Sequence, residues 1–282
     1  MLIKMKNSIY IVSFILGLLL NQCSNPVGPI EDHLQKLWEV PLSELSSSGF
    51  AVSNNSIILK TQVNTTGQLY KISMDGKNIQ TASIGGSTRG VPVVLNNVIY
   101  YNTSVYSLYA LNEGDLSIIW SKTGFVWIPI PTVDENYVYI TDLDVVSAVD
   151  KATGNTIWSK DIYGKNGANP VIDGNTIYFA TGGIFKGDGY LYSINKSNSS
   201  IIYEINIPYF EDKSQFGGSR AGVEIWNDQI YVSGDNRIFY CFNKNSGELL
   251  WTFEADAPIE ATSRVSDGYV YFGTLKIEPV TH

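Results

Sequence analysis

A hairpin that returns along the chain is the feature that most limits what this sequence can fold into. In Val149–Trp158 an apolar strand ends in Asp150, a polar turn follows, and a second strand reaches a Trp. The skeleton is an apolar residue, then Asp or Asn, at a fixed distance from an aromatic residue. It recurs at Leu111–Trp120, Ile194–Tyr203 and Phe242–Trp251, and a shortened copy at Ile72–Gln80 has lost the aromatic residue. Such a period predicts one supersecondary unit used many times.

A second hairpin alternates with the first. It has an apolar strand, a short turn of Asn, Asp or Gly, and a second strand with an apolar-Tyr pair at its centre. Its six copies turn at residues 54–55, 96–97, 134–136, 173–174, 227–228 and 267–268, and the first has Leu59 in place of Tyr. Asn-Asn and Asp-Gly tolerate the positive φ angles of a tight hairpin turn. Two hairpins together predict a four-stranded antiparallel unit of about forty residues, the period of a propeller blade.

These units predict an all-β chain: a six-bladed β-propeller over residues 36–282, made of four-stranded antiparallel blades. The last blade has room for a third strand and no fourth after Tyr271. Residues 36–40 have the form of the strand at 156–160. We therefore expect the N-terminal strand to complete the final blade and close the ring, which would remove the open sheet edges.

The N-terminal residues 1–22 form a predicted signal peptide of the lipoprotein type. Lys4 and Lys6 precede an apolar run at residues 9–20, which is short for a membrane-spanning helix and typical of a leader. The sequence before Cys23 resembles the lipobox of bacterial lipoproteins, except that Gln22 stands where that motif has a small residue. Cys23 is therefore the expected lipidation site, and residues 23–35 a tether. An ordinary secreted protein or an uncleaved anchor is the alternative.

The pattern A-x-D-x-x-T-G-x-x-x-W at residues 148–158 is similar to the PQQ-type β-propeller repeat. With residues 110–120, 170–180 and 242–251, the resemblance covers nearly all of residues 36–275. That family includes quinoprotein dehydrogenases and outer-membrane assembly lipoproteins of the BamB type. A lipobox followed by such a propeller resembles the second branch, although its propellers have more blades than the six expected here.

The resemblance implies that the repeated aromatic residues dock between adjacent blades. They are Trp38, Trp120, Trp158, Tyr203 and Trp251. A stacking platform for a ligand is the competing interpretation of these rings. Quinone catalysis would need a pair of adjacent cysteines, which the chain lacks, so the resemblance implies no cofactor.

Composition excludes several other functions. A formal net charge of −8 has the wrong sign for a nucleic-acid surface. The only histidines, His33 and His282, lie in the tether and at the last position, and the only cysteines are Cys23 and Cys241. Neither a His-based triad nor a Cys-based metal site is expected. The carboxylate pairs at residues 142/144 and 211/212 leave a carboxylate-based enzyme as a remote alternative.

Two irregular segments interrupt the repeat. Residues 181–189 enlarge a hairpin of the fourth blade, and residues 207–220 lengthen the connection to the fifth. Loops of these two kinds emerge on the same side of a propeller, where the connection at residues 124–127 also opens. We expect an interaction face there, and its residues are Phe125, Trp127, Phe185, Tyr209, Phe210, Phe216 and Arg220. Packing of the same residues against the propeller body is the alternative.

The function expected from the sequence is a non-catalytic, monomeric scaffold, anchored by lipid on the periplasmic side of a bacterial outer membrane. Its partners would be other envelope proteins, and the resemblance names β-barrel assembly machinery as a candidate. The first alternative is a glycan- or peptide-binding propeller that uses the channel mouth near Arg89, Asn169 and Arg220. The second is the carboxylate-based enzyme.

Overall fold

The fold is seen in a computed structural model of the full chain. It describes residues 8–9, 38–41, 49–53, 55–63, 66–86, 90–103, 106–126, 129–165, 168–183, 187–211, 217–266 and 268–274. Every regular element in these residues is a β-strand, so the predicted all-β class is confirmed. They contain no helix long and apolar enough to cross a membrane.

Five four-stranded antiparallel sheets make up most of the fold, and each runs in chain order. Blade 1 consists of β3 (Phe50–Val52), β4 (Ser56–Val63), β5 (Thr66–Ser73) and β6 (Ile79–Gly85). Blade 2 consists of β7 (Val93–Leu95), β8 (Val98–Asn102), β9 (Leu108–Asn112) and β10 (Ile118–Lys122). Blade 3 consists of β11 (Thr132–Val133), β12 (Tyr137–Asp142), β13 (Val145–Asp150) and β14 (Thr156–Asp161). Blade 4 consists of β15 (Val171–Asp173), β16 (Thr176–Thr181), β17 (Gly189–Asn195) and β18 (Ile201–Ile207). Blade 5 consists of β19 (Glu224–Trp226), β20 (Gln229–Ser233), β21 (Ile238–Asn243) and β22 (Leu249–Glu254).

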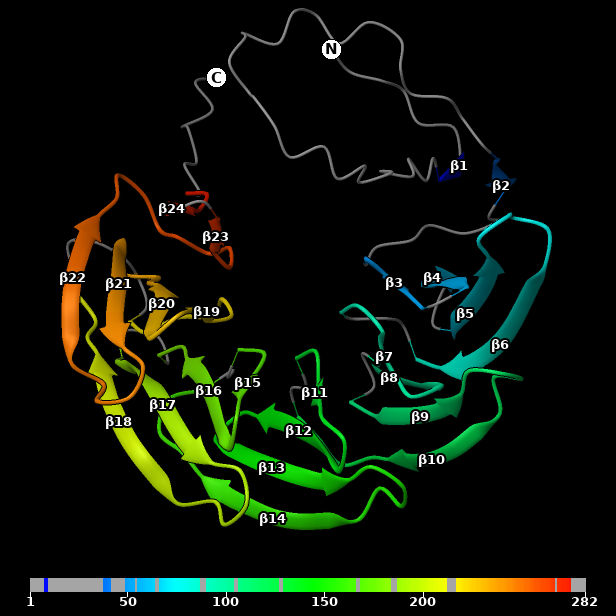
Figure 1. The fold of residues 1–282 in the computed structure, drawn as a ribbon, viewed down its shortest axis with the longest axis horizontal. Helices are drawn as coiled ribbons and strands as arrows, with labels where there is room; N and C mark the ends of the chain where they lie inside the picture. Colours follow the sequence, from blue (N-terminus) through cyan, green and yellow to red (C-terminus); the bar gives the residue numbers. More distant parts are fainter. Residues whose placement is uncertain are drawn as a thin grey trace, which may run out of the picture.

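The blades follow one another around an arc (Figure 1). The first strand of each blade lies on the inside of the arc and the fourth on the outside, as β11 and β14 show most clearly. This is the radial arrangement of a β-propeller, as the repeat predicts. Two further pairs complete the elements: β23 (Arg264–Ser266) with β24 (Tyr269–Tyr271), and β1 (Ser8–Ile9) with β2 (Val40–Pro41).

The turns form where the sequence places Asp, Asn and Gly. Between the first and second strands, Asn96 and Asn97 have φ angles of 50° and 61°, and Gly174 has 57°. Between the third and fourth strands, the Asp150 carboxylate accepts hydrogen bonds from the amides of Ala152 and Thr153. A side chain that caps its own turn in this way makes the hairpin a local property of the sequence.

The hydrophobic core lies between neighbouring blades. One buried cluster joins Tyr100 and Trp120 of blade 2 to Val138 of blade 3. Equivalent clusters join blade 1 to blade 2, blade 3 to blade 4, and blade 4 to blade 5. Each blade therefore depends on its neighbours for burial, as in other repeat architectures.

The sixth blade and the closing strand are only partly visible. Two strands, β23 and β24, stand in the position of a sixth blade, while β2 pairs with β1 and not with β24. Phe272 stacks on Phe239 of blade 5, with ring centroids 4.8 Å apart, so the chain continues along the sixth position after β24. Within the described residues the ring is not closed, and closure by the N-terminal strand stays a prediction.

Candidate interaction face

The propeller has two faces that differ in their construction. On one face, the turn after the third strand lies beside the turn after the first strand of the same blade. The backbone amides of Lys151, Lys196 and Lys244 donate to the carbonyls of residues 136, 175 and 228. We call this the turn face. The opposite side, where second strands turn into third strands and blades connect, is called the insertion face.

The repeated aromatic residues lie at the turn-face ends of the blade joints. The Trp120 indole donates to the Lys151 carbonyl of the next blade at 2.9 Å. Trp158 donates to Lys196 in the same way, and the Tyr203 hydroxyl donates to Lys244. Beneath Trp120 and Tyr203 lie glycines with little room for a side chain: a Cβ on Gly154 would meet the Trp120 ring at 2.8 Å, and one on Gly247 the Tyr203 ring at 3.0 Å. In the turn that Trp158 contacts, Ser199, with φ of 59°, holds the glycine's position. These aromatic rings therefore lie at packed blade joints.

The joint between blades 1 and 2 is also packed, but without an aromatic ring from the outer strand. Gln80 holds the strand position of the aromatic residue, since it pairs with Lys71 as Trp120 pairs with Ala110. The Lys71 ammonium donates to the Glu113 carbonyl at 2.6 Å, which replaces the indole N–H. Leu116, with φ of 62°, takes the glycine's position in the turn and is buried among blade 1 and blade 2 residues. A large turn residue thus fills the space that the missing ring leaves.

Trp251 differs from the other aromatic residues in its surroundings. Its side chain stacks on Phe239 but is 41% exposed, against 8% for Trp120. Leu249 and Phe253, on the same strand, are about half exposed. We call this last joint of the described arc the open joint; the residues that follow 274 on the sixth blade lie outside the described residues.

Ion pairs between blades add to the turn face. The Lys196 ammonium lies 2.8 Å from the Asp134 carboxylate of the preceding blade, and Lys244 pairs with Asp173 in the equivalent place. Burial alone would raise the pKa of Asp134. The hydrogen bonds from Lys196, two backbone amides and the Tyr139 hydroxyl outweigh burial and hold this pKa below its usual value. Asp134 is therefore bound as a carboxylate.

On the insertion face, the two irregular segments are joined to each other. The Gly183 amide donates to the Gly217 carbonyl, and the Gly217 amide donates to Gly187. Gly218 carries φ of 74°, and a Cβ there would lie 2.2 Å from the Thr181 carbonyl oxygen. Only glycine fits such a crossing of two backbones. The enlarged hairpin and the long connection therefore form one structure, which we call the glycine junction.

Side chains hold the long connection in place beyond the glycine junction. The Asp188 carboxylate accepts hydrogen bonds from the Tyr209 amide at 2.7 Å and from Asn206. The Asn236 amide group donates to the Pro208 carbonyl at 2.8 Å. Tyr209 and Phe210 are consequently half-buried and fixed in position.

Other apolar residues on the insertion face are more exposed. Tyr163, in the connection from blade 3 to blade 4, is 68% exposed, and Val126, in the connection from blade 2 to blade 3, is 53% exposed. The Asp142 carboxylate holds the Val126 amide at 3.0 Å, and Phe125 beside it is half-buried. Sequence reasoning missed Tyr163, whose signal was a Tyr-Gly step in a blade connection. Three residues expected on this face, Trp127, Phe185 and Phe216, lie outside the described residues.

Arg220 lies at the inner part of the insertion face. Its Nε donates to the buried Asp235 carboxylate at 2.8 Å, and its terminal nitrogen lies 3.2 Å from Glu260. Burial raises the pKa of Asp235 to about 6, and the neighbouring guanidinium only partly opposes this rise. The Asn169 side-chain carbonyl accepts from the Ile130 amide at 2.8 Å. Two of the expected channel-mouth residues therefore take part in protein hydrogen bonds, and Arg89 lies outside the described residues.

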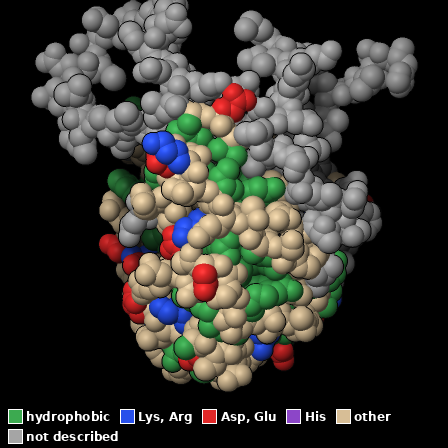
Figure 2. Space-filling view, turned by 90° about the vertical axis from the view of Figure 1, so that its right-hand side faces the viewer, with side chains coloured by type: hydrophobic (Ala, Val, Ile, Leu, Met, Phe, Trp, Pro, Cys, Tyr) green, Lys and Arg blue, Asp and Glu red, His purple; other side chains and the backbone are tan. Residues whose placement is uncertain are grey.

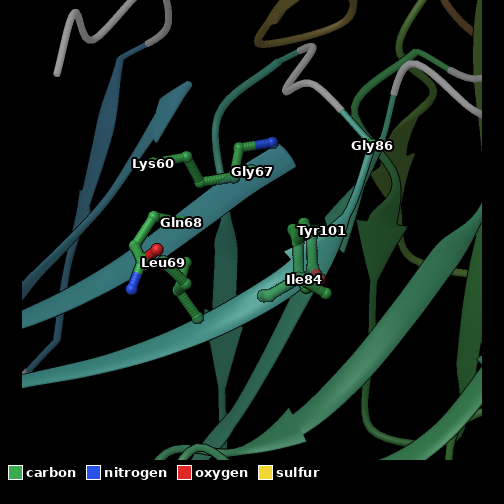
Figure 3. A pocket seen from close by; sticks show the side chains of 7 residues that line it. All are labelled: Lys60, Gly67, Gln68, Leu69, Ile84, Gly86 and Tyr101. Atoms are coloured by element: carbon green, nitrogen blue, oxygen red, sulfur yellow. The ribbon is translucent and has the colours of Figure 1, made fainter. Parts of the chain in front are cut away.

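A buried lysine is the group that sequence reasoning missed most completely. Lys60 follows three apolar residues on β4 and has no exposed surface. Its ammonium donates to the Asn102 carbonyl at 3.1 Å and lies 5.2 Å from the centre of the Tyr101 ring, both on the next blade. Figure 3 shows Lys60 and Tyr101 among the residues that line the narrow space between blades 1 and 2. Burial lowers the pKa of Lys60 to about 7.

Of the carboxylates considered for catalysis, Asp142 and Asp144 make contacts within the protein, and Asp212 lies outside the described residues. Asp142 binds a backbone amide, and Asp144 pairs with Lys165 at 3.8 Å. Burial raises the pKa of the Cys241 thiol to about 11, so it is a poor nucleophile at neutral pH. No group of three His, Cys, Asp or Glu side chains in the described residues could hold a metal ion.

Comparisons with known proteins agree with the repeat and the fold. The family model described as "Outer membrane protein assembly factor BamB" matches residues 32–125 and 122–204. The outer membrane protein assembly factor BamB of Yersinia pestis is 23% identical over 77% of this chain and 58% of its own length. A tetrathionate hydrolase of Acidithiobacillus ferrooxidans is 24% identical over 63% of this chain and 42% of its own length. The chain thus spans about half the length of these curated relatives.

A solved structure shows the same architecture. The crystal structure of BamB from Moraxella catarrhalis superimposes with a TM-score of 0.58 over 86% of each chain, at 10% sequence identity. At this identity the likeness concerns the fold alone. Together with the family match over residues 32–204, it confirms the resemblance that the repeats indicated. The chain belongs to the family of outer membrane protein assembly factor BamB, a family of β-propellers with PQQ-like repeats.

Proposed function

We propose that this protein is a non-catalytic, lipid-anchored scaffold that binds protein partners in the bacterial cell envelope and takes part in outer-membrane protein assembly. The observation that carries the proposal is the glycine junction on the insertion face. It fixes two irregular segments beside the exposed Tyr163, whose connection is hydrogen-bonded to Gly182 through Lys165. Val126, also exposed, lies in the neighbouring connection on the same face. Fixed loops with exposed aromatic residues are the common construction of protein-binding surfaces, because little entropy is lost on binding.

Family membership supports the same proposal. The matching family and the Yersinia relative are both named as outer membrane protein assembly factors. The partner in this proposal is a component of β-barrel assembly machinery. The residues expected to contact it include Phe125, Tyr209, Phe210 and Arg220, together with Tyr163 and Val126.

Crosslinking in intact envelopes tests the proposal. A tagged wild-type protein is compared with a double variant, Val126→Ser and Tyr163→Ser, and the captured proteins are identified by mass spectrometry. The matched control is Ile118→Ser and Ile157→Ser, since these residues are 56% and 51% exposed but lie on the outer strands. Figure 2 shows the right-hand side of Figure 1, where hydrophobic side chains lie at the surface among scattered charged ones.

We expect an assembly component to be captured by the wild type and by the outer-strand control, and lost from the insertion-face variant. Loss from both variants would place the contact elsewhere or indicate a general defect. Capture of no envelope protein by any form would refute the scaffold.

An enzyme is the second candidate, because one relative carries the name tetrathionate hydrolase. Incubation of the purified protein with tetrathionate, followed by analysis of the products, tests it directly. Turnover that survives purification and is abolished by Asp142→Asn, with the fold intact, would favour this candidate over the scaffold.

A further inference from the structure

Trp38 marks the point at which the N-terminal part of the chain joins the propeller. Its indole donates to the Met74 carbonyl of blade 1 at 2.8 Å, and a Cβ on Gly76 would meet its ring at 2.7 Å. Trp120 makes the same two contacts, with the Lys151 carbonyl and with Gly154 of the following blade. Trp38 therefore occupies on blade 1 the position that an outer-strand aromatic residue occupies on the next blade.

The direction of the chain at this point follows from the same comparison. Every outer strand begins at a turn on the turn face and runs toward the insertion face. β14, for example, starts after the turn at residues 150–155, and the next residue, Ile162, donates its amide to Asp144 in a second-to-third-strand turn. After Trp38, Val40 is buried against Ile57, Leu59 and Ile72 in the body of blade 1. The chain thus enters at the turn face and continues into the blade.

From this geometry we infer that an anchor at Cys23, attached through residues 24–37, holds the turn face toward the membrane and leaves the insertion face directed away from it. The partner is then a soluble domain that approaches from the aqueous side, and not the lipid surface. The inference rests on the proposed function in one respect, the lipid anchor at Cys23.

The charges of the turn face agree with a domain held off the bilayer. The turns of the turn face carry a carboxylate at residues 75, 113, 115, 134, 135, 150, 173, 228 and 248, and a lysine at residues 77, 151, 196 and 244. An excess of carboxylates resists contact with anionic lipid headgroups. Residues 24–35 are long enough, at roughly 3.3 Å per residue, to span about 40 Å between the lipid and the turn face.

Energy transfer from single labelled sites to an acceptor on lipid headgroups tests the orientation. Cysteine is introduced at Asn155 on the turn face or at Tyr163 on the insertion face, two positions in blade 3 or directly after it. A second pair is Asn245 on the turn face and Val126 on the insertion face. All four are surface positions, whereas the native Cys241 is fully buried. The acylated full-length protein is reconstituted into phosphatidylcholine vesicles that carry acceptor-labelled lipid.

We expect greater transfer from Asn155→Cys than from Tyr163→Cys, and from Asn245→Cys than from Val126→Cys. Equal transfer within each pair, or the reverse order, overturns the inference. Labelled protein without vesicles gives the baseline for each site, so differences in the dye's surroundings do not enter the comparison.

A second arm separates the inference from the anchor on which it rests. Residues 1–23 are replaced by a hexahistidine tag, and the protein is bound to vesicles that contain a nickel-chelating lipid. This attaches the chain at the same point without acylation. If the natural protein does not float with vesicles but the tagged protein shows the expected order, the lipid anchor is wrong and the orientation stands. If the tagged protein shows no order, the orientation is wrong whatever the anchor.

Discussion

The two faces of this propeller are built by different means. On the turn face, similar contacts recur from blade to blade: an Asp or Asn that caps its own turn, a lysine in blades 4 and 5 that reaches the preceding blade, and at most joints an aromatic ring that covers a small residue. On the insertion face, the glycine junction and the Arg220–Asp235 pair each occur once in the described residues. The comparison teaches that the repeated face carries the joints between blades. The insertion face carries none of these repeated joints, so its loops can differ from blade to blade. We expect the partner-binding residues there.

The largest expected effect is on a repeated joint. Trp120→Ala removes a ring that is 8% exposed and its hydrogen bond, and we expect a loss of about 3–5 kcal/mol in the free energy of unfolding. Trp251→Ala is the matched substitution at the open joint. Because that ring is 41% exposed, its loss is expected to be about 1–2 kcal/mol. Urea unfolding of both variants measures the difference, and equal losses would contradict the distinction between packed and open joints.

A substitution on the insertion face is expected to act more locally. Gly218→Ala places a Cβ 2.2 Å from the Thr181 carbonyl oxygen, in a backbone conformation with φ of 74°. We expect this substitution to lower the free energy of unfolding by about 2–4 kcal/mol. Hydrogen exchange should increase in residues 181–183 and 217–219 and remain unchanged in blades 2 and 3. Gly174→Ala is the control, since its Cβ meets no atom within 4 Å and only the φ of 57° opposes it. Exchange that increased evenly over all blades would show that the glycine junction is not a local structure.

The turn-face carboxylate Asp134 should stabilise the protein most at neutral pH. Its pKa is lowered in the folded state, so its contribution is present above the pKa of the unfolded chain and is lost as the pH falls through the folded pKa. Asp134→Asn is expected to cost up to about 1 kcal/mol at pH 7. Urea unfolding between pH 7 and pH 3 should show the wild type and the variant converging, and a constant difference would refute the pairing with Lys196.

The insertion-face carboxylate Asp235 should show the opposite trend. Its pKa is raised to about 6, so the contribution of its protonated form is present below the unfolded pKa and is lost as the pH rises toward 6. Relative to Asp235→Asn, the wild type should lose stability between about pH 4 and pH 6. The same urea series measures it, with Asp134→Asn as the comparison. A wild type that gained stability over this range would show that Arg220 outweighs burial.

How much the sequence could predict differs between the faces for a physical reason. The turn-face hairpins were predictable because Asp150 and its equivalents bond to amides two or three residues away. The position of Trp120 followed from the family resemblance, and its contacts repeat with the period. Lys60 and Asp235 were not predictable, because their burial depends on which residues the neighbouring blade brings to them. Tyr163 lies in a blade connection that does not follow the repeat, so no sequence pattern could predict its exposure.

The joint between blades 1 and 2 has a consequence for how such chains change over time. A glycine belongs to one repeat and the aromatic ring that covers it belongs to the repeat before. Where Gln80 stands instead of a ring, Leu116 in the next repeat fills the volume and Lys71 beside Gln80 makes the hydrogen bond. A repeat that is duplicated, deleted or exchanged is therefore compatible with only some neighbours. Across related chains, we expect the positions of Gln80 and Leu116 to vary together: a small residue, Gly or Ser, where the ring is kept, and a bulky residue where the ring is lost.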